Sequence, residues 1–275
     1  ISVRFSSRAS TSWLKPASQR KPAGRAARDR GAEARNTLAF FEAYFSNFIE
    51  GTEFEVYEAA AIVFRQAIPR DRPADAHDIL GTWQLVSDPV EMARTPADAD
   101  GLLDLLRRRH ARLMSARPEK GPGQFKREVN RAGQTVFVDP GHVEGTLRQG
   151  FELYLSLETA FARAVYMMFL VSEVHPFADG NGRIARVMAN AELVAAGEER
   201  ILVPTVYRAN YLSALKALSQ AQDPEPIVRV LDFAQRWVAA TPWMDLEETR
   251  VALERNHAFM DANEAENAGI RLRLP

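Results

Sequence analysis

The stretch HPFADGNGRIAR, residues 175–186, places an imidazole, a carboxylate, two glycines and two arginines directly after a run of core hydrophobic residues. Gly180 and Gly182 flank Asn181 just before an apolar pattern of helical spacing. Glycine lets a backbone approach phosphate oxygens closely or adopt a positive φ. The unpaired N–H groups at a helix N-terminus attract anions. The stretch therefore predicts an anion site, and a nucleotide polyphosphate fits it.

The charged side chains of this stretch extend the prediction to phosphoryl chemistry. Arg183 and Arg186 stand three apart on one side of the expected helix, where both can reach one polyphosphate. Asp179 would repel such an anion unless a cation lay between them, and Mg²⁺ binds through one or two carboxylates plus phosphates. The imidazole of His175, with an ordinary pKa of about 6.5, can accept a proton from an attacking hydroxyl.

Each of these features alone has an ordinary structural explanation. A histidine near a core helix is commonly structural, arginines in a first helical turn are commonly solvated, and Gly-Asn-Gly is commonly a turn. Their joint occurrence in one short stretch favours phosphate binding.

The elements that must position this stretch are expected to be helices, because apolar residues recur at helical spacing along most of the chain. One β element is expected, a hairpin around Asn130–Gly133 within residues 125–139, where β-branched and aromatic residues flank turn residues. The expected helices cover residues 37–50, starting at Asn36 or Thr37; 52–67, starting at a TEFE capping box; 98–117; 143–172, as one or two helices; 184–196; 209–220; 225–240; and 245–262.

Composition places the chain among ordinary globular proteins. It has 275 residues, 46% of them hydrophobic and 26% charged, with a net charge of −1. It has no cysteine, which excludes disulfides and thiol catalysis and agrees with a reducing compartment. The longest apolar run, residues 165–171, is shorter than the roughly 20 residues of a membrane span. We expect a cytoplasmic protein with no membrane contact.

The first 36 residues differ from the rest, because they are rich in arginine and poor in acidic residues. We expect residues 1–36 to be a flexible, solvated basic arm. A nucleic-acid-binding arm and a targeting leader are the alternatives, and the near-neutral total charge argues against nucleic acid as the main partner.

The motif of residues 175–186 resembles the signature of the Fic family, HPFx(D/E)GNGRxxR, at every specified position. The order of helices, the hairpin before the motif and the stretch RILVPTVYRANYLSALKAL after it also resemble Fic proteins. The resemblance implies a mainly α fold, a Fic-type helical bundle with a short β-hairpin flap. It divides the chain into residues 1–36, the arm; 37–97, N-terminal helices; 98–222, the Fic core; and 223–275, a C-terminal helical extension.

The same resemblance implies a protein adenylyltransferase that moves AMP from ATP to a hydroxyl side chain of a target protein. It assigns His175 as the base and Asp179 as the Mg²⁺ ligand. The nucleotide site consists of Gly180, Asn181, Gly182, Arg183 and Arg186, and Tyr211 aligns with a tyrosine of the adenine pocket in some relatives. A phosphorylating branch replaces the glycine and arginine of this stretch, and retention of Gly182 and Arg183 favours AMP transfer. The partners implied are ATP and a target protein on the hairpin flap, with a homo-oligomer as a further possibility.

A second pattern, SNFIEG at residues 46–51, resembles the inhibitory motif (S/T)xxxE(G/N) of the family. Ser46 and Glu50 are four apart and share a helix face. The resemblance implies that Glu50 pairs with Arg186 and blocks placement of the γ-phosphate, and because the pattern precedes the catalytic motif it implies the class with an N-terminal inhibitory helix. A carboxylate on that guanidinium competes directly with phosphate. Removal of AMP by the same site, and a nucleotide-binding regulatory module associated with DNA, are the alternative functions.

Overall fold

The computed structural model describes residues 26–133 and 135–275, which fold into helices and one short hairpin. The expected mainly α class with a hairpin flap is confirmed. None of the described helices is both long and apolar enough to span a bilayer. The helices are α2 Ala32–Ile49, α3 Val56–Arg65, α4 Pro73–Val86, α5 Pro89–Met92, α6 Ala99–Leu113, α7 Val143–Leu155, α8 Ala160–Val174, α9 Asn181–Ala195, α10 Arg208–Ala221, α11 Glu225–Ala240, α12 Leu246–Arg255 and α13 Ala262–Asn267.

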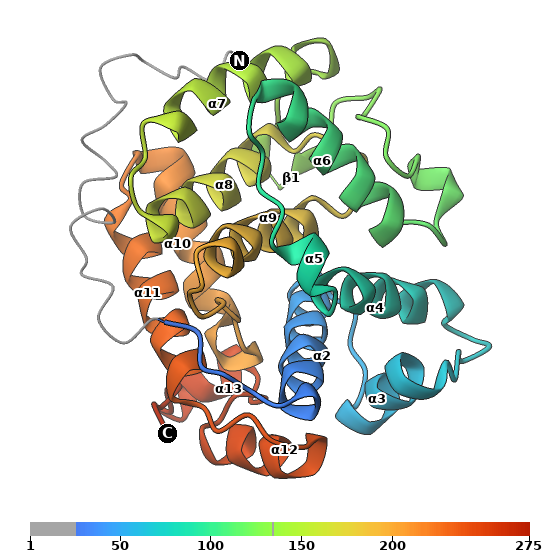
Figure 1. Cartoon of the computed structure of the whole chain (residues 1–275), viewed down its shortest axis with the longest axis vertical. Coiled ribbons are helices and arrows are strands. Elements are labelled where there is room, and N and C mark those ends of the chain that lie inside the picture. The colour runs from blue at the N-terminus through green and yellow to red at the C-terminus, as the bar shows by residue number, and fades with distance from the viewer. Residues whose placement is uncertain (1–25, 134) are drawn as a thin grey trace.

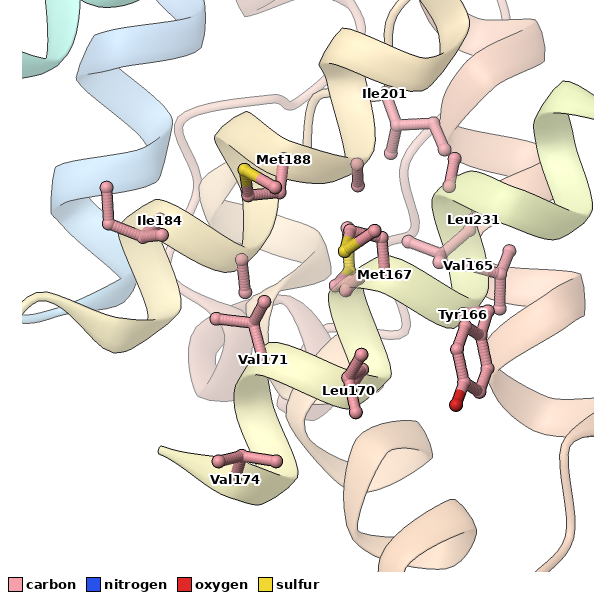
Figure 2. Close-up of a cluster of buried hydrophobic side chains, with 14 of the residues drawn as sticks. Val165, Tyr166, Met167, Leu170, Val171, Val174, Ile184, Met188, Ile201 and Leu231 are labelled. Carbon is pink, nitrogen blue, oxygen red and sulfur yellow. The ribbon is translucent and has the colours of Figure 1, made fainter. Parts of the chain in front are cut away.

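Helices α8 and α9 form the centre of the molecule and pack against each other along their length (Figure 1). Their facing sides carry apolar residues at helical spacing, among them Met167, Val171, Ile184 and Met188, which are fully buried (Figure 2). Leu231 of α11 closes one side of the same cluster. The loop that joins α8 to α9 is residues 175–180, so the packed core fixes the backbone on both sides of the loop that begins the HPFADGNGRIAR motif.

Helix α2 lies beside α4 and against α9 (Figure 1). It begins at Ala32 rather than at Asn36 or Thr37, and its N-terminus has no side-chain cap. The preceding residues are held to the body instead, because Ala26 forms a β-bridge with Glu198. The described part of the expected arm is therefore not free in solvent, and residues 1–25 lie outside the described residues.

The next helix also differs from expectation, since the capping box at residues 52–55 does not start it. Helix α3 begins at Val56, and no side chain caps its N-terminus. Phe54 is buried, and its carbonyl accepts a hydrogen bond of 3.0 Å from the Tyr44 hydroxyl. Burial of Phe54 keeps residues 52–55 in a loop. Pro73 occupies the first turn of α4, where its missing N–H costs nothing.

The hairpin lies where it was expected, but its strands are short. β1, Arg131–Ala132, pairs antiparallel with β2, Thr135–Val136, with Arg131 opposite Val136. At the other end of the chain, the helix expected over residues 245–262 is interrupted. His257 has a φ of +63°, which an α-helix does not tolerate, and the chain resumes helical structure at α13.

Candidate active site

The backbone between α8 and α9 forms a tight loop closed by one side chain. Asn181 Oδ1 accepts a hydrogen bond of 2.8 Å from the Phe177 N–H, and its Nδ2 donates one of 2.9 Å to the Phe177 carbonyl. The first intrahelical bond of α9 runs from Ile184 N to Gly180 O. The N–H groups of residues 181–183 therefore have no partner within the helix and point out of its N-terminus. The Asn181 side chain braces this loop, and what Asn181 offers an anion is its backbone N–H.

Gly180 makes the turn into α9 possible. Its φ is +73°, and a Cβ there would lie 3.0 Å from the Met114 sulfur. A residue with a side chain would meet both backbone strain and a close contact at this position.

His175 is half-buried at the end of α8, and its ring is held on two sides. Its Nδ1 lies 3.2 Å from the Ser172 carbonyl, and its ring stacks on Phe137 with centroids 3.7 Å apart. A carbonyl only accepts, so Nδ1 carries the proton and Nε2 keeps a lone pair. Burial lowers the pKa of His175 to about 4, and the ring is therefore neutral near pH 7. The imidazole is in the form that a general base requires.

Asp179 lies on the open side of the loop, with 41% of its side chain exposed. Its Oδ1 accepts a hydrogen bond of 2.6 Å from the Gly180 N–H. No group of three or more His, Asp or Glu side chains within residues 26–133 and 135–275 could hold a metal ion by itself. A single exposed carboxylate beside an anion site suits Mg²⁺, which commonly takes one carboxylate and completes its shell with phosphates and water.

His110 supports this loop; the sequence shows no ligand spacing around it, and we expect it to be structural or exposed. It is fully buried, and its ring stacks on Phe177 with centroids 3.7 Å apart. Its Nε2 lies 3.1 Å from the Asp179 carbonyl, and its Nδ1 accepts from the Gly123 N–H at 2.9 Å. Burial lowers the pKa of His110 to about 4, so it is a neutral donor to the Asp179 backbone.

Helix α2 brings Ser46 and Glu50 onto Arg186, as the expected pairing requires. Arg186 Nε donates to Ser46 Oγ at 2.9 Å, and its NH2 group donates to the Ser46 carbonyl at 2.8 Å. The same NH2 group lies 2.6 Å from Glu50 Oε1. Arg186 is buried, and the Nε and NH2 groups of its guanidinium are engaged by Ser46 and Glu50.

The Glu50 carboxylate also covers the first turn of α9. A Cβ placed on Gly182 would lie 2.2 Å from Glu50 Oε1 and 3.0 Å from its Cδ. The close approach of these two residues explains why glycine is needed at position 182 while Glu50 is in place. The carboxylate thus lies beside the helix N-terminus at which the sequence predicts an anion.

Arg183 is held by Asp78, which the sequence does not single out, and its NH2 group also lies 3.7 Å from Asp179 Oδ1. Its NH1 group lies 2.9 Å from Asp78 Oδ2 on α4, and both side chains are 4% exposed. Arg117 also binds Asp78, at 2.7 Å. Arg183 Nε is buried and has no hydrogen-bond partner among the described residues. This guanidinium retains a donor that a phosphate oxygen could satisfy.

Tyr211 lies in the core rather than on an open surface, with 1% of its area exposed. Its hydroxyl is 3.4 Å from the Met168 sulfur, and it also contacts the Arg186 guanidinium. The Tyr211 side chain thus contacts Arg186 from within the core, and its buried ring is not open to a nucleobase.

Comparison with known proteins gives a consistent result. Residues 100–193 match the Fic/DOC family. Protein adenylyltransferase Fic of Drosophila persimilis is 27% identical over 203 residues, which are 72% of this chain and 39% of that protein. Protein adenylyltransferase Fic of Drosophila melanogaster is 26% identical over 203 residues, 41% of its length. This chain therefore spans less than half the length of these curated relatives.

Two solved structures share the fold. Fic-1 from C. elegans superposes with a TM-score of 0.60 over 79% of this chain and 64% of that one, at 20% identity. A Fic domain containing signaling protein from Bacteroides thetaiotaomicron gives a TM-score of 0.64 over 80% of this chain and 89% of that one, at 16% identity. At such identities the likeness concerns the fold.

Proposed function

We propose that this chain, which is a Fic domain protein, transfers AMP from ATP to a hydroxyl side chain of a target protein and is restrained by its own Glu50. The observation that carries the proposal is the arrangement at the start of α9. A neutral imidazole, His175, lies in the loop before an anion-binding helix N-terminus. The carboxylate of Glu50 lies on Arg186 at the same helix end.

The geometry supports a defined role for each group. Nε2 of His175 takes the proton from the target hydroxyl, whose oxygen forms a bond to the α-phosphorus of ATP. The bond from that phosphorus to the bridging oxygen breaks, and pyrophosphate leaves. The N–H groups at the start of α9 stabilise the charge on the transferring phosphate, and Arg183 and Arg186 bind the β/γ end.

Asp179 is the residue that would hold Mg²⁺. When bound, the cation would neutralise charge on the polyphosphate, as it does in phosphoryl transfer generally. The exposed Asp179 carboxylate and the unpartnered Arg183 Nε agree with a bound phosphate group at this position.

Restraint by Glu50 follows from competition for the same donors. A γ-phosphate needs N–H donors of Arg186, and Ser46 and Glu50 occupy its Nε and NH2 groups. A phosphate that entered beside Glu50 would also meet its negative charge close to Gly182. Movement of the Glu50 carboxylate is therefore the step that allows ATP to bind productively.

Intact-mass spectrometry of the Glu50→Gly protein incubated with Mg²⁺ and ATP, GTP or UTP tests the proposed activity. We expect an added mass equal to AMP in the ATP sample, located by peptide mapping on a hydroxyl side chain. The Glu50→Gly/His175→Ala protein is the control and should carry none. An absence of adducts on both the protein and a cell lysate would contradict the proposal.

A second candidate function is removal of AMP from a modified target. It is favoured by the Glu50 carboxylate, whose Oε1 binds Arg186 and whose Oε2 could orient a water molecule in front of His175. Here the wild-type protein, and not Glu50→Gly, would strip AMP from a modified hydroxyl. Release of AMP from a labelled substrate by the wild-type protein distinguishes the two directions.

A further inference from the structure

Outside the motif itself, the hairpin base makes an unusual set of contacts with the backbone around His175. Lys126, which is 5% exposed, donates its backbone N–H to the Pro176 carbonyl at 2.8 Å. Its ammonium donates to the Val174 carbonyl at 3.3 Å. The base of the flap thus holds the carbonyl groups on both sides of the imidazole-bearing residue.

Asn130 completes this set. Its Nδ2 donates to the Phe177 carbonyl at 2.8 Å, and its Oδ1 accepts from the Lys126 ammonium at 2.7 Å. The Asn130 carbonyl accepts from the Phe137 N–H at 3.2 Å, and Phe137 is the ring that stacks on His175. Lys126 is therefore connected both to the loop backbone and to the ring that covers the imidazole.

The backbone of His175 needs such support. Its φ is +50°, a left-handed conformation that costs a residue with a side chain about 1 kcal/mol or more. The His175 N–H donates to the Val171 carbonyl at 3.0 Å, and the carbonyls of Val174 and Pro176 on either side of His175 accept from Lys126. A shift there would also break the 3.2 Å contact of Nδ1 with the Ser172 carbonyl, which keeps the lone pair on Nε2.

Burying the Lys126 ammonium costs more free energy than a merely structural contact requires. Burial lowers the pKa of Lys126 to about 8, which reflects the cost of placing its charge there. No acidic side chain of the described residues forms an ion pair with it. Its donors are used on Val174 and Asn130, both next to the reacting imidazole.

We propose that Lys126 is a positioning residue for the transfer reaction, which holds the left-handed backbone of His175 through Val174 and Pro176 and so aims Nε2 at the incoming hydroxyl. It touches neither ATP nor the acceptor. Its effect therefore falls on the transfer step and not on nucleotide binding. The expected effect on the rate of transfer rests on the proposed function, whereas the expected effect on the tautomer of the His175 ring does not.

The first arm of the test is independent of activity. Long-range ¹H–¹⁵N NMR of labelled histidine reports which ring nitrogen of His175 carries the proton. We expect the single Nδ1–H form in the wild-type protein and a mixture of the two tautomers in Lys126→Met. Lys126→Arg, which still donates to a carbonyl, should restore the single form. An unchanged His175 spectrum in Lys126→Met would overturn the inference.

The second arm measures auto-AMP transfer in the Glu50→Gly background. Lys126→Met should lower kcat by roughly 10- to 100-fold, the usual cost of misaligning a general base, with KM for ATP changed by less than about 3-fold. Lys126→Arg should recover most of the rate. Lys216→Met, which changes an exposed lysine of α10, is the matched control and should behave like its parent.

Asn130→Ala provides a second route if Lys126→Met does not fold. It removes the donor to the Phe177 carbonyl and should produce the same tautomer mixture and the same selective loss of kcat. Equal losses in kcat and in ATP affinity, or failure of Lys126→Arg to recover, would overturn the inference. If the Glu50→Gly parent transfers no AMP, the proposed function fails, and the NMR arm alone decides the role of Lys126.

Discussion

At the scale of single residues, the site is defined by how three side chains share one helix end. Glu50 and Ser46 engage the Nε and NH2 groups of Arg186, and Gly182 leaves the space that the Glu50 carboxylate fills. Charge-assisted hydrogen bonds in a buried place are about twice as strong as neutral ones. A phosphate must replace these contacts with its own before it can bind.

The space at Gly182 gives a coupled prediction. Gly182→Ala should destabilise the wild-type protein, because the new Cβ would overlap Glu50 Oε1. It should lower the free energy of unfolding by about 1–3 kcal/mol more in the wild-type background than in the Glu50→Gly background. Urea unfolding of the wild type, Gly182→Ala, Glu50→Gly and the double variant measures this coupling. Gly145→Ala, on α7 with no atom within 4 Å of its Cβ, is the control and should show none. Additive free energies of unfolding would contradict the contact.

At the scale of elements, α9 does more than present its N-terminus. Its far half carries Glu192, which is 4% exposed and accepts a hydrogen bond of 2.9 Å from the Tyr154 hydroxyl. Burial raises the pKa of Glu192 to about 7. The folded protein therefore binds a proton at this carboxyl that the unfolded chain, with an ordinary pKa near 4.3, has released.

A carboxyl whose pKa is raised in the folded protein adds to the free energy of unfolding at low pH. This contribution is lost as the pH rises through about 7. Between pH 6 and pH 8 the wild-type protein should lose about 1 kcal/mol relative to Glu192→Gln, whose amide does not titrate. Urea unfolding of both proteins at the two pH values measures this difference. Glu152→Gln, on the exposed side of α7, should follow the wild type. A constant difference between Glu192→Gln and the wild type would show that Glu192 does not titrate in this range and would contradict the prediction.

The sequence predicts the local parts of this architecture better than its tertiary contacts. The motif loop, the hairpin and helices α7 to α11 depend on nearby residues, and they lie where they are expected, whereas the helix expected over residues 245–262 is interrupted at His257. The starts of α2 and α3 do not, because docking of residues 26–30 and burial of Phe54 decide them. Asp78 and Lys126 have ordinary sequence contexts, and only folding brings them to Arg183 and His175.

At the scale of the whole molecule, the segment before α2 is tied to the turn after α9. Arg30 forms two hydrogen bonds with the Glu199 carboxylate, at 2.9 and 2.7 Å, in the turn after α9. The two side chains are 9% and 1% exposed. Since α2 carries Glu50, this buried pair links the position of the restraining helix to the body that holds the motif.

Loss of one partner of a buried pair leaves the other charge uncompensated. Arg30→Met should therefore lower the free energy of unfolding by about 2–4 kcal/mol. Arg229→Met, which breaks an exposed pair with Glu225 on α11, should cost less than about 1 kcal/mol. Urea unfolding measures both. Equal small effects would show that residues 26–30 contribute little to the fold.

The account as a whole depends on Glu50 restraining AMP transfer, and the initial rate of labelled AMP incorporation from Mg²⁺-ATP tests this most directly. One charged hydrogen bond of about 1.5–3 kcal/mol corresponds to a rate about 10- to 100-fold higher in Glu50→Gly than in the wild type. Glu53→Gly, which removes an exposed acidic residue of the following loop, should keep the wild-type rate. A Glu50→Gly rate equal to or below that of the wild type would contradict the account.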